Sequence, residues 1–517
     1  MIIDLVIVLI YFTAIMVVAL SGRSAKEMST EEYFLSNRNL RWPSIALSTI
    51  ATNIQGYQFL GMMGSAYLYG LAQANLEINA ITGLWMAAFI FVPLYLKDKV
   101  ITITQFIQKR LGRYVGLAYS LANLLIFSTI GLGAALFWGA YAAELVFGDY
   151  LVLISENRLL RVAILVVGLG VFSAIYTFFG GLSAVVRTDI IQFAILTIGG
   201  SVVLFTAIHH LGGWPELYKK TPELMHLHLP ADHQDLPWTL VFGLFLLNIN
   251  YWCANQSVVQ RSLAARSLKE AQIGLMVGGL MKVFMAVIIV VPGIALAGIL
   301  ADNPLAEPDQ TFPYLVTTYL PVGVRGLILC ALFASLMSTV DSTFNSLATL
   351  WSIDIYKGFI KPDATDQETV RAGRMSIIFT LVTGITMGLI LLYLKFENPE
   401  AAFTHQLNEL RYYINCGIVV IICSAAFLIL PKQWIVILAF LVTIPINIWI
   451  KQSYPEMNYF VRAMWVILSG LSIVSIASRL GGRLRKTKEF LFSGDSKVSI
   501  YGYLLLCLML LLHLIFH

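Results

Sequence analysis

The stretch "STIATNIQGYQFLG" (residues 48–61) lies within an apolar run long enough to span a membrane, yet it contains Asn53, Gln55 and Gln58. Amide side chains are costly in hydrocarbon, so we expect them to face protein or a cavity and to serve function. A second stretch, "LNINYWCANQ" (247–256), repeats this polar interruption five predicted spans later. Matching interruptions in two halves predict a transporter built from inverted repeats with broken helices. The alternative is a pair of continuous helices joined by amide hydrogen bonds.

The overall composition of the chain is typical of a membrane protein. The chain has 517 residues, of which 58% are hydrophobic and 12% are charged, and its mean hydropathy is +0.79. Soluble domains carry about 25% charged residues. Apolar runs of about 18 to 30 residues are long enough to cross the hydrocarbon core as helices. We therefore predict an all-α polytopic membrane protein with fourteen spans, at residues 3–21, 44–68, 75–97, 118–147, 160–178, 187–209, 237–254, 273–300, 324–353, 373–393, 405–430, 433–450, 460–478 and 499–516.

The basic residues alternate from loop to loop along this arrangement. If the loop at 22–43 is cytoplasmic, every odd-numbered loop should be rich in Lys and Arg. The odd loops hold 24 of the 34 basic residues, the even loops and their flanks hold eight, and two lie within spans. The net charge of +5 is thus a topology signal and predicts no nucleic-acid partner. We expect a multi-pass protein of the cell membrane, with both termini outside and a retained first span rather than a signal peptide.

The loops are too short to hold a soluble domain, so the work must be done within the membrane. The longest predicted outer loops are 210–236 and 301–323. A transporter-like sensor would need a signalling domain, which these loops do not provide. We find no nucleophile–base pair and no metal-ligand spacing among the five cysteines. We therefore expect no enzymatic activity and no obligatory protein partner beyond the lipid bilayer.

The ninth span, "ASLMSTVDSTFNSLAT" (334–349), carries polar residues at helical spacing. A shared helix face is expected for Ser335, Ser338, Asp341, Ser342 and Asn345. Carboxylate, hydroxyl and amide oxygens are hard ligands that suit a small cation. The alternative is a face that hydrogen-bonds to neighbouring helices.

Two ionisable residues are further candidates, one within the eighth span and one near the start of the sixth. Lys282 is about nine residues into the eighth span, roughly 14 Å deep, and is expected to face a cavity or a carboxylate such as Glu77. A purely structural ion pair is the alternative. Asp189 follows the paired glycines that end the fifth span, and spacing alone leaves open that it caps a helix N-terminus.

Several motifs resemble a known family. "GGLSAVVRTDIIQ" (180–192) is similar to the signature of the sodium/solute symporter family. "NYWCANQSVVQRSLAARSLKEAQIG" (250–274) resembles the sugar branch of that family, which includes sodium/glucose cotransporters and a bacterial sodium/galactose symporter. The resemblance covers residues 1–360 well and becomes weaker beyond them.

The resemblance implies a LeuT-like core of two inverted repeats with five helices each, and sodium-driven uptake by alternating access. Residues 1–43 would form the first helix and a cytoplasmic loop. Residues 44–210 would form the first repeat (spans 2–6), and residues 211–430 the second (spans 7–11). Residues 431–517 would form three peripheral helices.

The resemblance also implies particular site residues. Sodium (Na+), the co-transported ion, would bind the carbonyls of Ala51, Ile54 and Ser335 and the hydroxyls of Ser338 and Thr339, with Asp189 near its cytoplasmic exit. The substrate would bind Asn53, Gln58, Glu77, Asn248 and Lys282, with Tyr251 as the inner gate. Amides, one carboxylate and one ammonium can satisfy sugar hydroxyls, and an aromatic ring can stack on the pyranose.

The sequence departs from the family pattern at three places, and the first is Asn79, which stands near a serine of the family. The sugar-binding glutamine expected in the eleventh span is matched by either Gln406 or Asn408, and Arg411 is nearby. Asp341 replaces a small residue and suggests a second cation site. The leading hypothesis is a sodium-coupled symporter for a hexose such as glucose or galactose. The alternative is a symporter for inositol or an acidic sugar such as sialic acid, with Arg411 pairing to its carboxylate.

Overall fold

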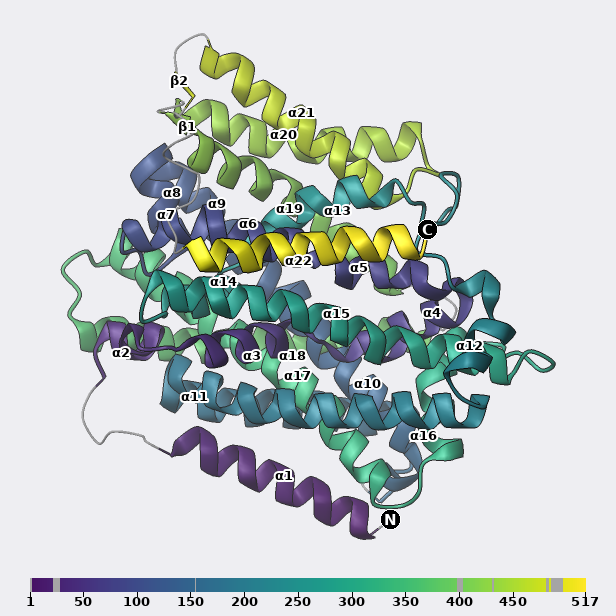
Figure 1. Ribbon diagram of the computed structural model, residues 1–517. Coiled ribbons are helices and arrows are strands. Elements are labelled where there is room, and N and C mark those ends of the chain that lie inside the picture. Colours follow the sequence, from purple (N-terminus) through teal and green to yellow (C-terminus); the bar gives the residue numbers. More distant parts are fainter. Residues whose placement is uncertain are drawn as a thin grey trace.

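The computed structural model describes residues 2–21, 28–153, 155–397, 403–429, 432–479, 483–484 and 496–517. These residues form a bundle of helices that are roughly parallel or antiparallel to one another (Figure 1). The helices are α1 (Ile2–Leu20), α2 (Thr30–Leu35), α3 (Trp42–Asn53), α4 (Met63–Tyr69), α5 (Asn75–Ile78), α6 (Ala80–Met86), α7 (Val92–Lys97), α8 (Ile103–Leu111), α9 (Arg113–Ile126), α10 (Leu132–Leu151), α11 (Arg158–Leu211), α12 (Trp214–Lys220), α13 (Leu240–Asn248), α14 (Gln256–Leu263), α15 (Leu268–Ile299), α16 (Thr311–Tyr319), α17 (Val324–Thr349), α18 (Asp366–Glu397), α19 (Phe403–Phe427), α20 (Gln433–Ser453), α21 (Tyr459–Arg479) and α22 (Ser496–Ile515).

Short π-helical and 3-10 segments interrupt or join these helices. The π-helical segments are η2 (Gln58–Met62), η4 (Ala87–Phe91), η5 (Phe127–Gly131), η7 (Ile249–Cys253) and η9 (Leu350–Ile360). The 3-10 segments are η1 (Ser36–Arg38), η3 (Gly70–Ala74), η6 (Pro222–Leu224) and η8 (Pro308–Gln310). Two-residue strands β1 (Leu428–Ile429) and β2 (Arg483–Leu484) pair antiparallel. The all-helical prediction is confirmed apart from this short pair.

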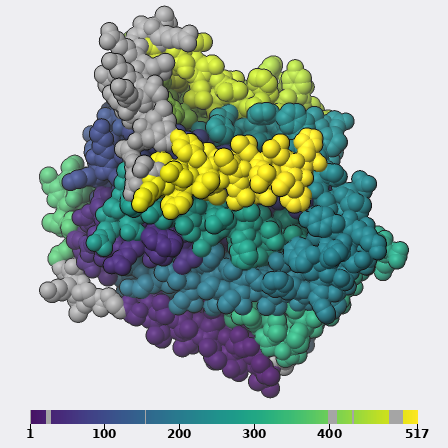
Figure 2. All heavy atoms as spheres, in the orientation of Figure 1, coloured from purple at the N-terminus to yellow at the C-terminus, as the bar shows by residue number. Residues whose placement is uncertain are grey.

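The described chain contains eleven helical stretches that are long and apolar enough to cross a membrane. A helix or a helical arm coincides with each of the fourteen predicted spans, although the count of fourteen stays a prediction. The two marked ends of the chain lie at the same end of the bundle, which also carries α12 and α16 (Figure 1). The opposite end carries α2, α8 and α14. Helix α22 lies across one face of the molecule (Figure 2).

The 54 residues of α11 are two helical arms and not one straight rod. Gly181 has φ +55°, and a Cβ there would lie 2.3 Å from the Tyr33 carbonyl oxygen. Tyr176 contacts Asp341, while Asp189 contacts Ser338, which is less than one turn away on α17. In a straight helix these two α11 residues would be about 20 Å apart. The chain therefore reverses at this glycine, as expected for the fifth and sixth spans.

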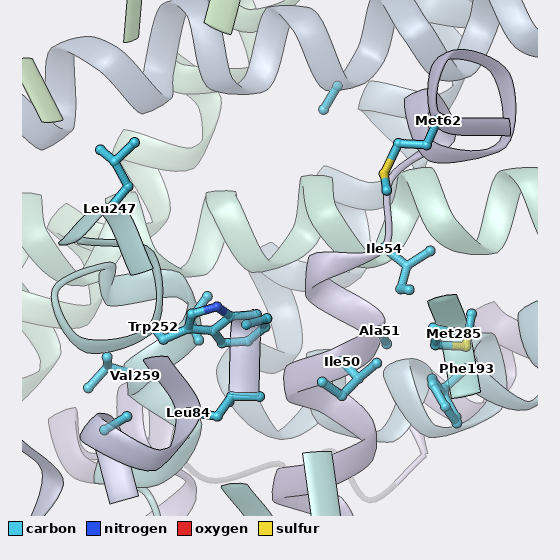
Figure 3. Close-up of a cluster of buried hydrophobic side chains, with 14 of the residues drawn as sticks. Ile50, Ala51, Ile54, Met62, Leu84, Phe193, Leu247, Trp252, Val259 and Met285 are labelled. Carbon is cyan, nitrogen blue, oxygen red and sulfur yellow. The ribbon is translucent and has the colours of Figure 1, made fainter. Parts of the chain in front are cut away.

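The interruption predicted in the second span is confirmed. Helix α3 ends at Asn53, Ile54 adopts an extended conformation, and the chain resumes helical structure at η2. Figure 3 shows this helix carrying Ile50 and Ala51, ending near Ile54, and the chain continuing toward Met62. The seventh span behaves alike, since η7 is followed by a break at Ala254 before α14 begins. Both stretches of unusual amide content therefore contain a break in the helix, the first at Ile54 and the second at Ala254.

Candidate functional site

A cavity of about 230 Å³ lies beside both breaks. Asn53, Gln58, Glu77, Asn248, Tyr251 and Lys282, the six sugar-binding candidates of spans 2, 3, 7 and 8, all line it. The lining reaches Tyr459, the first residue of α21, and the ring of Tyr412 stacks on that tyrosine at 5.5 Å. The neighbouring Asn458 donates to the carbonyl of Asp235, in the connection that follows α12. The cavity therefore extends toward the end of the bundle that carries both termini.

An ion pair joins the two sides of the break in the second span. The ammonium of Lys282 bonds to the Glu77 carboxylate, and both side chains are almost fully buried. The same ammonium donates to Asn53 Oδ1 at 2.5 Å, immediately before the break. Gln58, immediately after it, donates from Nε2 to Glu77 Oε1 at 2.7 Å. The predicted pairing of Lys282 is confirmed, and we call these four residues the clamp.

The clamp also explains why two backbone carbonyls near the break lose their usual partners. The Gln55 N–H, which would bond to Ala51 in a continuous helix, donates to Gln58 Oε1 at 2.6 Å. The Gln58 N–H bonds to the Gln55 carbonyl at 2.9 Å instead of the Ile54 carbonyl. A helix end leaves such carbonyls without intrahelical donors. The carbonyls of Ala51 and Ile54, both sodium candidates, are thus released by the break.

Helix α17 brings two of the three remaining sodium candidates, Ser335 and Thr339, to the same place. The Thr339 hydroxyl lies 3.2 Å from the carbonyl oxygen of Thr52 and 3.2 Å from that of Ser335. Thr52 directly follows Ala51 in the sequence, so the hydroxyl and carbonyl candidates meet at the end of α3. The Ser338 hydroxyl points elsewhere and donates to Asp189 at 2.5 Å.

Asp189 is the centre of a second polar network, toward the opposite end of the bundle. Its carboxylate accepts from Ser48 at 2.5 Å and from Arg261 at 3.3 Å. Arg261 also donates to Ser48 at 3.0 Å and to Ser342. Neither the aspartate nor the arginine has any exposed side-chain surface. The alternative of a helix cap at Asp189 is wrong, because the residue lies inside α11, eight positions after the Gly181 turn.

Asp341 lies on the neighbouring face of α17 and is also fully buried. Its carboxylate accepts from the Tyr176 hydroxyl at 2.6 Å and from Ser342 at 3.4 Å. Asn345, one turn further on, has both side-chain polar atoms buried without a partner in the described part of the chain. The predicted polar face of this helix therefore points into protein along its whole length.

Other residues of the cavity lining are not among the site residues predicted from the sequence. They include Tyr57, Phe127, Asn250, Tyr412 and Asn415. Aromatic residues are common in membrane helices, and the sequence does not show which amides of a span face the cavity, so only the spatial arrangement identifies these. Arg411 lines the cavity too, as the acidic-sugar alternative requires. The side chains of Gln406 and Asn408 lie outside the described residues.

Comparison with known proteins decides the family. A model of the sodium:solute symporter family matches residues 33–422. The chain belongs to the sodium:solute symporter family. The sodium/glucose cotransporter of Vibrio parahaemolyticus is 29% identical over 92% of this chain and 90% of its own length. Sodium/glucose cotransporter 4 of Mus musculus is 32% identical over 74% of this chain, which spans 59% of that longer protein.

Solved structures agree on the fold of this family member. A structure described as the substrate-bound outward-open state of a Na+-coupled sialic acid symporter superimposes with a TM-score of 0.80 at 19% identity, covering 93% of this chain and 99% of that one. Mhp1, a nucleobase-cation-symport-1 family transporter, gives 0.52 at 12% identity, covering 93% of this chain and 100% of its own. At these identities the likeness concerns the fold alone.

Proposed function

We propose that the chain imports a sugar by sodium-coupled symport and alternating access. In the simplest form of this proposal, the sugar is a hexose such as glucose or galactose. The observation that carries this proposal is the clamp, because Lys282 and Glu77 present both donors and acceptors inside one cavity beside a broken helix. Sugar hydroxyls donate and accept, so such a set can bind them. The sodium/glucose cotransporters named above support the same substrate class.

The clamp suggests how sodium and sugar binding are coupled. Sodium bound by the released carbonyls of Ala51 and Ile54, with Ser335 and Thr339, would hold the end of α3 in one conformation. Ser338, the fifth candidate, would have to leave Asp189 to join them. Asn53 and Gln58 flank that break and belong to the clamp. Sodium would therefore preorganise the sugar site, and thermodynamic linkage makes the effect mutual. In this proposal Asn248 and Tyr251 complete the sugar site.

The orientation follows from the same proposal. With both termini outside the cell membrane, the cavity faces outward and the Asp189–Arg261 network closes the cytoplasmic side. The division into repeats at 44–210 and 211–430 is retained as part of the proposal. The chain would act as a transporter and not as an enzyme, consistent with the names of its relatives.

The buried Asp341 supports a second, smaller proposal, that another cation binds on its face of α17. Its carboxylate and the unpartnered Asn345 amide supply hard oxygen ligands in a fully buried place. The measurement is the sodium-activation curve of uptake, for which we expect a Hill coefficient above one. A coefficient near one that is unchanged in Asp341→Ala would contradict the second site.

A substrate panel in proteoliposomes tests the main proposal. Labelled glucose, galactose, inositol and sialic acid are offered with an inward sodium gradient, and the same vesicles with potassium replacing sodium are the control. We expect sodium-dependent accumulation of at least one sugar. Uptake that is equal in sodium and potassium, or confined to inositol, would overturn the sugar assignment.

A further inference from the structure

Arg411 is a positively charged residue of the cavity wall without a full set of partners among the residues that the structure describes. It lies in α19 and lines the cavity. One of its terminal nitrogens donates to the Ile130 carbonyl at the long distance of 3.4 Å. Its Nε is buried and has no hydrogen-bond partner. A guanidinium has five N–H donors in a planar fork, so most of its binding capacity is unused here.

The charges of the cavity do not balance without another anion. Among the described lining residues, Glu77 is the carboxylate and Lys282 and Arg411 are the cations. Glu77 is already neutralised by Lys282. The carboxylate nearest to Arg411 in sequence, Glu409, is bound by Lys451 at 2.9 Å and by Arg462. The described part of the cavity therefore carries a net charge of +1.

An uncompensated charge in such a place is costly, because the guanidinium is partly buried and its Nε has lost contact with water without gaining a partner among the described residues. The phenols of Tyr57, Tyr251 and Tyr412 line the same cavity but are neutral hydroxyl groups. A carboxylate fits the unused fork, since two parallel N–H···O bonds form with the planar guanidinium. The missing counter-charge is therefore expected to arrive with the substrate.

We propose that Arg411 determines specificity and that the substrate is a sugar acid, a hexose that bears one carboxylate. This inference rests on the proposed function, because it names the class of sugar that the symporter carries. The clamp binds the hydroxyl groups, and Arg411 pairs with the carboxylate. A neutral hexose leaves the guanidinium without a counter-charge and binds more weakly.

The test compares matched pairs of sugars that differ only in oxidation at the terminal carbon. Sodium-dependent uptake of D-galacturonate and D-glucuronate is measured beside that of D-galactose and D-glucose in proteoliposomes. We expect the half-saturating concentration of a uronate to be at least about tenfold lower than that of its neutral partner. Arg411→Gln should raise the uronate value at least about tenfold and so remove most of the difference between the uronate and its neutral partner, with Arg411→Lys between wild type and Arg411→Gln.

Arg158→Gln is the control for loss of one positive charge, because Arg158 is half exposed and lies outside the cavity lining. It should leave both values unchanged. Equal wild-type values for uronate and neutral hexose would overturn the inference even if no Arg411 variant folds. An equal loss of uptake of both sugars in Arg411→Gln would overturn it too. So would galactose uptake that depends on chloride in the wild type but not in the Arg411 variants, because chloride would then supply the counter-charge. Sodium-independent handling of all four sugars would instead overturn the proposed function itself.

Discussion

The two polar networks of the protein have similar chemistry and opposite surroundings. The clamp uses an ammonium, a carboxylate and two amides, and its members line a cavity. The Asp189–Arg261 network uses a guanidinium, a carboxylate and hydroxyl groups, and no surface of its charged pair is exposed. Both networks bond to α3, the clamp at Asn53 and the second network at Ser48. One short helix therefore connects a site that can receive a ligand with a region that is fully closed.

The surroundings of each network determine what it can do. Sugar hydroxyls can replace the mutual bonds of the clamp, because the cavity gives them access. The bonds of Arg261 can break only if the helices around it separate, since its partners come from α3, α11 and α17. Such separation is what alternating access requires on the closed side. The clamp is thus suited to binding, and the buried network to holding one side shut.

The largest effect is expected from breaking the clamp. Glu77→Gln leaves the Lys282 ammonium buried without a counter-charge, which costs about 3–5 kcal/mol in comparable buried pairs. We expect sodium-dependent sugar uptake to fall by at least about a hundredfold, together with a lower thermal midpoint. The double variant Glu77→Gln/Lys282→Met should regain the thermal midpoint but not the uptake. Normal uptake in the single variant would show that the pair is only structural.

A smaller effect is expected from the closed side. Arg261→Gln leaves Asp189 with its serine partners but without its positive charge. We expect the packing of α14 to loosen, so backbone hydrogen exchange there should accelerate by about tenfold, while exchange in α21 stays unchanged as an internal control. Sugar binding from the cavity side should persist, because the clamp is untouched. Unchanged hydrogen exchange in α14 would show that the Asp189–Arg261 network does not hold that side of the protein closed.

The comparison also shows what could be inferred without the structure. Asn53, Gln58 and Lys282 were recognisable because amides and an ammonium are rare at membrane depth. Arg261 was counted as a loop residue, since a basic side chain near a span end is the ordinary topology signal. Its burial depends on how α14 packs against three distant helices, which no local pattern encodes.

The cavity, too, could be predicted from the sequence only in part. The breaks were visible as local changes in composition, but the stacked pair of Tyr412 and Tyr459 in the cavity lining depends on the packing of α19 against α21. The turn at Gly181 was suggested by paired glycines, whereas the direction of Asp189 was not. Local chemistry therefore predicted which residues matter, and long-range packing determined which of them meet.

The smallest effect concerns the link between the two networks. Thr339 contacts the Thr52 carbonyl, on the segment of α3 that separates Ser48 from Asn53. Thr339→Ala removes one proposed sodium ligand without creating a buried charge, so apparent sodium affinity should fall by about five- to tenfold. Sugar affinity should weaken at limiting sodium and recover at saturating sodium, because linkage acts through occupancy of the ion site.

Thr343→Ala is the matched control, because that hydroxyl also borders the cavity but donates to the Thr339 carbonyl. It should leave both affinities within about twofold of wild type. Sodium and sugar titrations of uptake, each at two concentrations of the other solute, provide the readout. A loss of sugar affinity in Thr339→Ala that persists at saturating sodium would assign this threonine to the sugar site. Coupling would then have to act directly through the clamp and not through the end of α3.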